Sequence, residues 1–205
     1  VVLQYVSFTK QYERNFLKTT SLLEKSFKNI LESYKVVLLE FSKEIKKKNL
    51  FLESVKLSEL FEKSYTYGSG DANGAKIHLS SINWVGKGDT PTVGRFGPLL
   101  YKLEFSPEYL ERLKRSPGKL EISNVIPEAG NSEPPLTNLG IGVDDEKEVY
   151  RGFVNARIQP QTLLESLSGL ENEDKVRVVL LDQKAQVLAS SLDLSADAKK
   201  ELNQI

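Results

Sequence analysis

The sequence predicts an α+β fold: a long N-terminal helix packed on an antiparallel sheet, then a short connecting helix and a C-terminal strand pair. Two observations predict it. Residues 1–67 contain no glycine or proline, whereas all thirteen glycines lie between Gly68 and Gly169 and all eight prolines between Pro91 and Pro160. Apolar residues also recur every three or four positions in the first 45 residues, and short alternating segments follow. The first third is therefore predicted to be helical, and the middle to form strands and turns.

The helix is predicted from one apolar stripe whose mean spacing is close to the α-helical period. A helix of 45 residues is about 68 Å long, which exceeds the width of a small domain. Part of it must therefore project or pair, and we expect either a helix that lies only on its own sheet or one that also dimerises. A second helix is predicted over residues 51–65. The stripe consists of Tyr5, Phe8, Tyr12, Phe16, Leu23, Phe27, Ile30, Tyr34, Val37, Phe41 and Ile45.

Strand signals begin after the glycine-rich segment 67–74. The helix "SPEYLERLKRSPG" among them has Ser106 as its N-cap and Pro107 at its first position. The segment "LTNLGIGVDDEKEVYRGFVNARI" is predicted to be a hairpin, with its acidic turn exposed to solvent. The other predicted elements are strands over 76–90, 95–105, 119–126, 176–183 and 187–191 and a helix over 161–168. This order predicts a mostly antiparallel sheet with helices packed against it.

The composition excludes several classes of protein. Lys and Arg together number 28, as do Asp and Glu, and this zero net charge argues against a nucleic-acid-binding protein. The absence of cysteine excludes disulfides and thiolate metal sites. No run of about 18 apolar residues is present, so nothing in the sequence is predicted to span a bilayer. Since the chain begins "VVLQYV" without methionine, we expect a piece of a longer protein whose membrane segment lies upstream.

No catalytic group of residues is recognisable. His78 is the only histidine, which disfavours both a zinc site and a serine–histidine triad. The segments "GSGDANG" and "VGKGDT" lack the glycine spacing of nucleotide-binding loops. We therefore predict that this domain is not an enzyme and holds no cofactor or metal.

The order of these segments resembles that of the extracytoplasmic PAS-like sensor domains called Cache or PDC domains, which occur in bacterial histidine kinases and chemoreceptors. The resemblance covers residues 20–192 and rests on "WVGKGDT", Tyr109, the Gly152-Phe153 pair and "VVLLDQKAQVL". It implies a PAS-like sheet and three regions: an N-terminal helical region over 1–64, a sensor lobe over 65–160, and the connecting helix and C-terminal strand pair over 161–205. The last region either closes this lobe or begins a truncated second lobe.

A ligand pocket in such a domain needs apolar walls and a few aimed polar groups. Arg157 stands where amine-binding members carry an aspartate, so the resemblance does not extend to recognition of an ammonium group. Arginine's planar fork suits carboxylates and phosphates, and we therefore predict a small anionic ligand. The candidate ligand-binding residues are Trp84, Arg95, Phe96, Tyr101, Leu103, Tyr109, Arg112, Ser123, Tyr150 and Arg157.

The resemblance implies the sensory domain of a membrane-bound bacterial signalling protein, a sensor histidine kinase above all. Such a domain lies at the periplasmic face of the inner membrane, anchored by transmembrane helices outside this chain. The long helix would pair two copies and carry the signal. The alternative is a non-catalytic, dimerising interaction domain without a small-molecule ligand.

Overall fold

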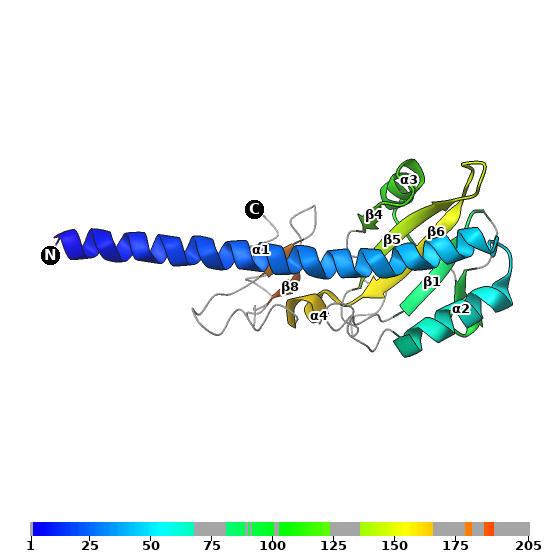
Figure 1. Ribbon diagram of the computed structural model, residues 1–205, viewed down its shortest axis with the longest axis horizontal. Helices are drawn as coiled ribbons and strands as arrows, with labels where there is room; N and C mark the ends of the chain where they lie inside the picture. Colours follow the sequence, from blue (N-terminus) through cyan, green and yellow to red (C-terminus); the bar gives the residue numbers. More distant parts are fainter. Residues whose placement is uncertain are drawn as a thin grey trace.

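The computed structural model describes residues 2–67, 81–88, 90, 92–100, 103–123, 136–165, 179–181 and 187–190. Side chains of the two N-terminal helices are described from residue 17 to residue 63. Within these limits one long helix runs beside a curved sheet, and its N-terminal half extends past the sheet (Figure 1). None of the helices described is both long enough and apolar enough to cross a membrane.

Helices α1 (Val2–Lys47) and α2 (Ser54–Tyr67) form the N-terminal region. The predicted glycine-free helix is thus confirmed as one continuous element. It ends where Asn49 adopts the left-handed conformation (φ 50°) and the Leu50 amide donates to the Ile45 carbonyl at 2.9 Å. This is the hydrogen bond of a Schellman cap, in which asparagine is a common substitute for glycine. The chain then reverses into α2.

The six-stranded sheet is antiparallel throughout, in the order β3-β2-β1-β6-β5-β4. The long pair β5 (Thr137–Asp144) and β6 (Tyr150–Ile158) forms the predicted hairpin. The strand β1 (Ser81–Gly86) pairs with β6, so that Trp84 lies opposite Val154. The remaining strands are short: β2 (Val93–Gly94), β3 (Gly97–Pro98) and β4 (Leu120–Ile122). The predicted α+β architecture is confirmed.

The main core lies between α1 and one face of the sheet. Tyr34, Leu38, Phe41 and Ile45 recur at helical spacing on α1 and are buried. They pack with alternate residues of the central strands, because side chains at every second position of a strand share a face. These strand residues are Ile82, Trp84, Leu139, Ile141, Val143, Val154, Ala156 and Ile158.

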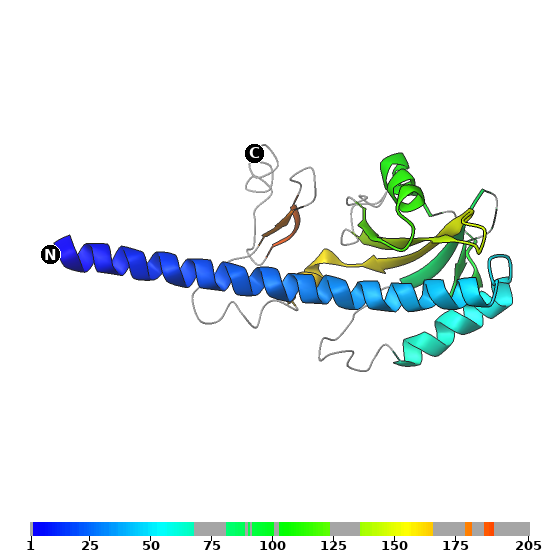
Figure 2. The ribbon, with the colours of Figure 1, turned by 45° about the horizontal axis from the view of Figure 1, so that its top comes forward.

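The helix α3 (Pro107–Arg115) lies on the opposite face of the sheet from α1 (Figure 2). Its predicted N-cap is confirmed, since the Ser106 hydroxyl accepts a hydrogen bond from the Tyr109 amide at 3.3 Å. After β6 come α4 (Pro160–Glu165) and the antiparallel pair β7 (Val179–Leu181) and β8 (Val187–Ser190). The predicted connecting helix and C-terminal strand pair are therefore present.

Two predictions are wrong. Of the strand expected over 95–105, only the edge strand β3 at Gly97–Pro98 is present among the described residues of that segment, because Gly97 has a φ of 109° and Pro98 has no amide to donate. The acidic turn is also not wholly exposed. Asp145 is buried, and its carboxylate accepts hydrogen bonds from the Lys147 and Val149 amides, each at 2.9 Å.

Candidate ligand-binding site

The face of the sheet opposite α1 carries the residues that bear on ligand binding. Helix α3 lies directly on β5 there, because Gly140 and Gly142 present no side chain. A β-carbon at Gly140 would collide with the Tyr109 hydroxyl, and one at Gly142 would collide with the Leu113 carbonyl. Tyr109 and Leu113 are fully buried. No ligand can therefore enter between α3 and β5 without displacing the helix, and access to this face must come from beside α3.

Buried amides form a polar row across this face. The Tyr109 hydroxyl donates to Oδ1 of Asn155 at 3.4 Å, and the Asn155 amide donates to Oδ1 of Asn138 at 3.1 Å. Asn138 in turn donates to the Ser123 hydroxyl at 3.3 Å. Asn83 lies opposite Asn155 in the ladder and is also buried. Because burying an amide without a partner is costly, these mutual hydrogen bonds hold the side chains in fixed positions.

Two tyrosines on or near this face remain neutral. Burial raises the pKa of the Tyr109 hydroxyl well above its ordinary value. Burial also raises the pKa of Tyr150, and the nearby Asp144 carboxylate raises it further. Both hydroxyls therefore act as neutral hydrogen-bonding groups at any physiological pH.

Beside α3 lies an open groove with a volume of about 920 Å³. Its apolar walls include Val85 and Phe153 from the sheet and Leu110 from α3. The size is within the usual range for sites that hold small molecules, although the groove is not enclosed. It is lined by Val85, Gly86, Lys87, Gly88, Thr90, Thr92, Leu99, Leu100, Leu103, Glu104, Phe105, Leu110, Glu111, Lys114, Tyr150 and Phe153.

Six of the sequence-predicted residues lie on this face or in its groove. Leu103 and Tyr150 line the groove. Tyr109 and Ser123 belong to the polar row, and Arg157 lies next to Asn138 in the ladder. Arg112 of α3 is bound to β4, as its side chain donates to Glu121 at 2.8 Å and to the Ile122 carbonyl at 2.7 Å.

The other predicted residues lie elsewhere. Trp84 is on the opposite face, buried in the main core, where its indole donates to the Phe51 carbonyl at 3.3 Å. Arg95 lies at the β2–β3 turn, with its guanidinium 5.0 Å from the Phe96 ring centre. Phe96 is 92% exposed and does not line the groove. Tyr101 falls outside the described residues.

Sequence reasoning missed the three buried asparagines. A signal for them exists: Asn138 and Asn155 occupy the same alternating positions as Gly140, Gly142 and Phe153. Asparagine at an inward position of a long strand indicates a buried hydrogen-bond partner, since an isolated buried amide is disfavoured. In the part of the chain that the structure describes, no three acidic or histidine side chains gather closely enough to hold a metal ion.

The architecture matches solved bacterial sensor domains. The ligand-binding domain of the amino-acid chemoreceptor PctC from Pseudomonas aeruginosa PAO1, solved with GABA, superposes with a TM-score of 0.58 at 14% identity, over 92% of this chain and 77% of that one. The ligand-binding domain of the Pseudomonas fluorescens chemoreceptor CtaA, solved with L-serine, gives a TM-score of 0.62 at 12% identity, over 85% and 70%.

The periplasmic domain of Vibrio cholerae LuxQ gives a TM-score of 0.54 at 15% identity, over 88% of this chain and 82% of that one. The chain has the fold of these sensor domains. The fold expected from the resemblance to Cache domains is thereby confirmed. No protein-family model matches the sequence, and no curated protein does. At these identities the sensor fold is shared, whereas the ligand has to be argued from this chain's own residues.

Proposed function

We propose that this chain is an extracytoplasmic sensory domain that binds a small ligand in the groove beside α3. The observation that supports it is the arrangement of one face of the sheet. Buried amides and close contacts with glycine fix α3 there, while a groove remains open next to the helix. The chemoreceptor domains with the same fold were solved with amino acids or GABA bound. Helix α3 borders this groove directly, and helix α1 contacts the other face of the same sheet.

The proposed ligand is a small anion. Lys87 and Lys114 line the groove, and Arg157 lies on the same face of the sheet. Glu104 and Glu111 also line the groove, and the Lys114 ammonium lies 3.9 Å from the Glu111 carboxylate. The groove therefore carries both signs of charge, and Lys87 and Lys114 are the lining side chains that would hold the anion.

A thermal-shift screen tests both parts of this proposal. We expect one or more small organic acids to raise the melting temperature, and the corresponding amines to leave it unchanged. Leu110→Trp fills the groove from α3 and should abolish the shift. Leu52→Trp is the matched control, because Leu52 is 80% exposed and does not line this groove. Stabilisation by amines alone, or an equal shift in the Leu110→Trp variant, would contradict the proposal.

We further propose that two copies pair through α1. The outward face of this helix carries no charged residue at six successive positions with alternating spacings of three and four. Leu22 and Val36 on this face are 45% and 46% exposed, although both are large apolar side chains. The spacing is that of the contact positions of a two-stranded coiled coil, and Leu22 and Val36 are the apolar residues among the six. The positions are Thr19, Leu22, Ser26, Asn29, Ser33 and Val36.

The placement in the cell belongs to the same proposal. The LuxQ domain, which shares the fold, is periplasmic. We propose the same compartment for this chain, with transmembrane helices in the parent protein and a histidine kinase as the output.

The division into regions 1–64, 65–160 and 161–205 also remains a prediction. The alternative function, a dimerising interaction domain without a ligand, predicts pairing through α1 and no shift in the ligand screen.

A further inference from the structure

Arg112 connects the helix beside the groove with the edge of the sheet. Its Nε donates to the Glu121 carboxylate at 2.8 Å, and Nη2 donates to the Ile122 carbonyl at 2.7 Å. The guanidinium also lies 5.9 Å from the centre of the Tyr109 ring. The Arg112 and Glu121 side chains are 33% and 19% exposed. Two charge-assisted hydrogen bonds from one planar group set the position of α3 relative to β4.

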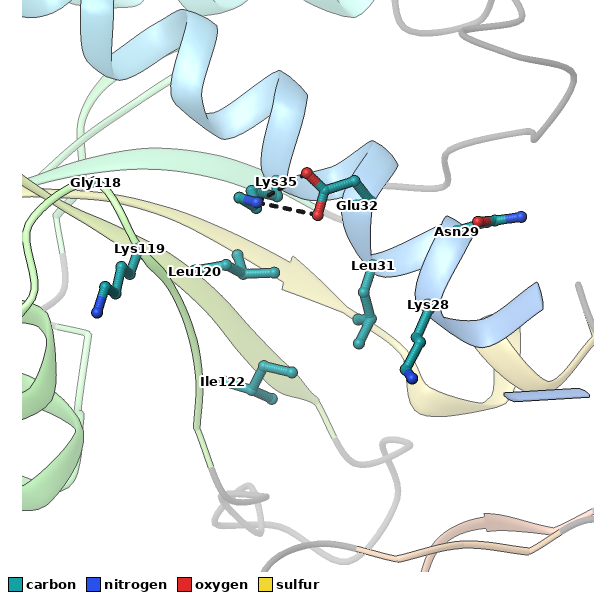
Figure 3. A pocket seen from close by; sticks show the side chains of 9 residues that line it. All are labelled: Lys28, Asn29, Leu31, Glu32, Lys35, Gly118, Lys119, Leu120 and Ile122. Carbon is teal, nitrogen blue, oxygen red and sulfur yellow. Dashed lines mark hydrogen bonds and ion pairs between the residues drawn. The ribbon is translucent and has the colours of Figure 1, made fainter. Parts of the chain in front are cut away.

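The strand β4 faces α1 across a second open groove (Figure 3). Leu120 and Ile122 project toward Leu31 of α1, and the groove between them has a volume of about 620 Å³. Leu120 and Ile122 also pack against the core to which α1 contributes. The strand is thus in contact with the core but separated from the adjacent part of α1 by open space. On its other side β4 is paired with β5, so a change in its distance from that part of α1 requires this edge of the sheet to bend, and the open groove leaves room for that movement.

The same helix α3 therefore borders both features. Leu110, Glu111 and Lys114 line the ligand groove, while Arg112 is bound to β4. Building on the proposed function, we infer that Arg112 is a positioning residue that couples the ligand groove to α1. A displacement of α3 moves β4 through Arg112 and changes the width of the groove between β4 and residues 28–35 of α1. Coupling of this kind is reciprocal, so a constraint on the second groove must alter α3.

This reciprocity allows a test without any ligand. The chain has no cysteine, so Lys28→Cys and Lys119→Cys introduce a unique pair across the second groove. Both side chains are exposed. Bis-maleimide linkers of graded length would fix the groove at different widths. Hydrogen exchange, followed by mass spectrometry of a peptide covering 107–113, would then report on α3, with the two single-cysteine variants carrying the same maleimide as references.

We expect linking to change exchange in α3 by about fivefold or more, the lower end of usual coupling between sites. In Arg112→Gln the change should vanish, whereas Arg115→Gln should retain it, because Arg115 is 79% exposed on the same helix. Arg112→Lys, which keeps the charge but not the planar fork, should retain part of the effect and serves if Arg112→Gln does not fold. If Arg112 only stabilised α3, Arg112→Gln would change hydrogen exchange in α3 by the same amount with and without the linker.

Two outcomes would overturn the inference. Exchange in α3 that is indifferent to every linker length shows that the second groove and α3 are uncoupled. An equal linker effect in Arg112→Gln shows that the constraint reaches α3 through the chain between Arg115 and Lys119 instead. Neither outcome bears on ligand binding in the first groove, which the thermal-shift screen tests separately.

Discussion

At the scale of single residues, the α3 face of the sheet is defined by what is small and what is polar. Gly140 and Gly142 allow the helix to approach β5, and beside them Asn155 donates a hydrogen bond to Asn138. Neither pair contributes a large apolar surface. On this face close approach and hydrogen bonding act beside a small apolar cluster of Tyr109, Leu113 and Phe153, whereas the larger apolar core lies on the α1 face.

Gly140→Ala tests the close approach of α3. The added methyl group would meet the Tyr109 hydroxyl, so α3 must shift or the side chain must leave its rotamer. We expect a loss of about 1–3 kcal/mol in the free energy of unfolding, measured by urea denaturation. Adding Tyr109→Phe, which removes the obstructing oxygen, should recover part of the loss. Additive losses in the double variant would mean that the two groups do not meet.

Asp145 gives the acidic turn a predictable pH dependence. A hydrogen bond from the Val149 amide is the main cause that lowers the pKa of Asp145, and Arg151 and the Lys147 amide lower it further. The unfolded chain therefore binds a proton more readily at acid pH. Stability should fall as pH drops from about 5 to 3, through the ordinary carboxyl pKa toward the lowered one. Asp145→Asn should show a shallower fall in urea denaturation; parallel curves would contradict this.

Asp144 should behave in the opposite sense and provides the comparison. Burial raises the pKa of its carboxyl, although Lys46 opposes the shift. The folded chain then holds the proton more tightly than the unfolded chain does. Ionisation of Asp144 therefore destabilises the folded protein as pH rises through the raised pKa. Asp144→Asn should remove this loss near neutral pH, and a variant that loses stability on the same rise in pH would contradict the assignment.

At the scale of elements, the local signals of the sequence that were strongest proved reliable. Three of these signals are present in the structure: the glycine-free helix, the Ser106-Pro107 start of α3 and the β5–β6 hairpin. The strand predicted over 95–105 is present only at Gly97–Pro98 among the described residues of that segment. Leu100 is fully exposed, and Pro98 ends the pairing.

The candidate site could be predicted only in part, for a reason specific to strands. Alternation separates the two faces of a strand but does not say which face meets the long helix. Trp84 and Asn83 illustrate this, since the larger side chain turned out to lie in the main core and the asparagine on the α3 face. Arg112 could not be assigned from sequence, because its partners Glu121 and Ile122 lie on a different element.

The N-cap of α3 gives the prediction at this scale. The Ser106 hydroxyl accepts from the Tyr109 amide, and the Ser106 backbone is extended (φ −67°, ψ 144°), as an N-cap requires. Ser106→Ala should cost about 1 kcal/mol in the free energy of unfolding. Ser106→Asp, which keeps an acceptor, should cost much less. Equal losses for the two variants in urea denaturation would show that this hydrogen bond does not support α3.

At the scale of the whole molecule, dimerisation through α1 is the property most open to measurement. The double variant Leu22→Glu with Val36→Glu places carboxylates on the proposed contact face. We expect the dimer dissociation constant to rise at least about tenfold, equivalent to 1.4 kcal/mol, in sedimentation equilibrium. Leu52→Glu is the control, since Leu52 is exposed on a different part of the molecule. If the unsubstituted chain stays monomeric at high concentration, the proposed pairing is refuted.

The pairing of β1 with β6 has a consequence for how the chain is made. In the β1–β6 ladder Ser81 is paired with Arg157 and Gly86 with Gly152, so the centre of the sheet joins segments that are distant in sequence. Contacts of such long separation form slowly, because a long loop must close first. During synthesis α1 emerges with its apolar stripe well before β6 can provide a sheet to cover it. The nascent chain is therefore expected to depend on chaperones over that interval, and truncations that end before β6 should aggregate.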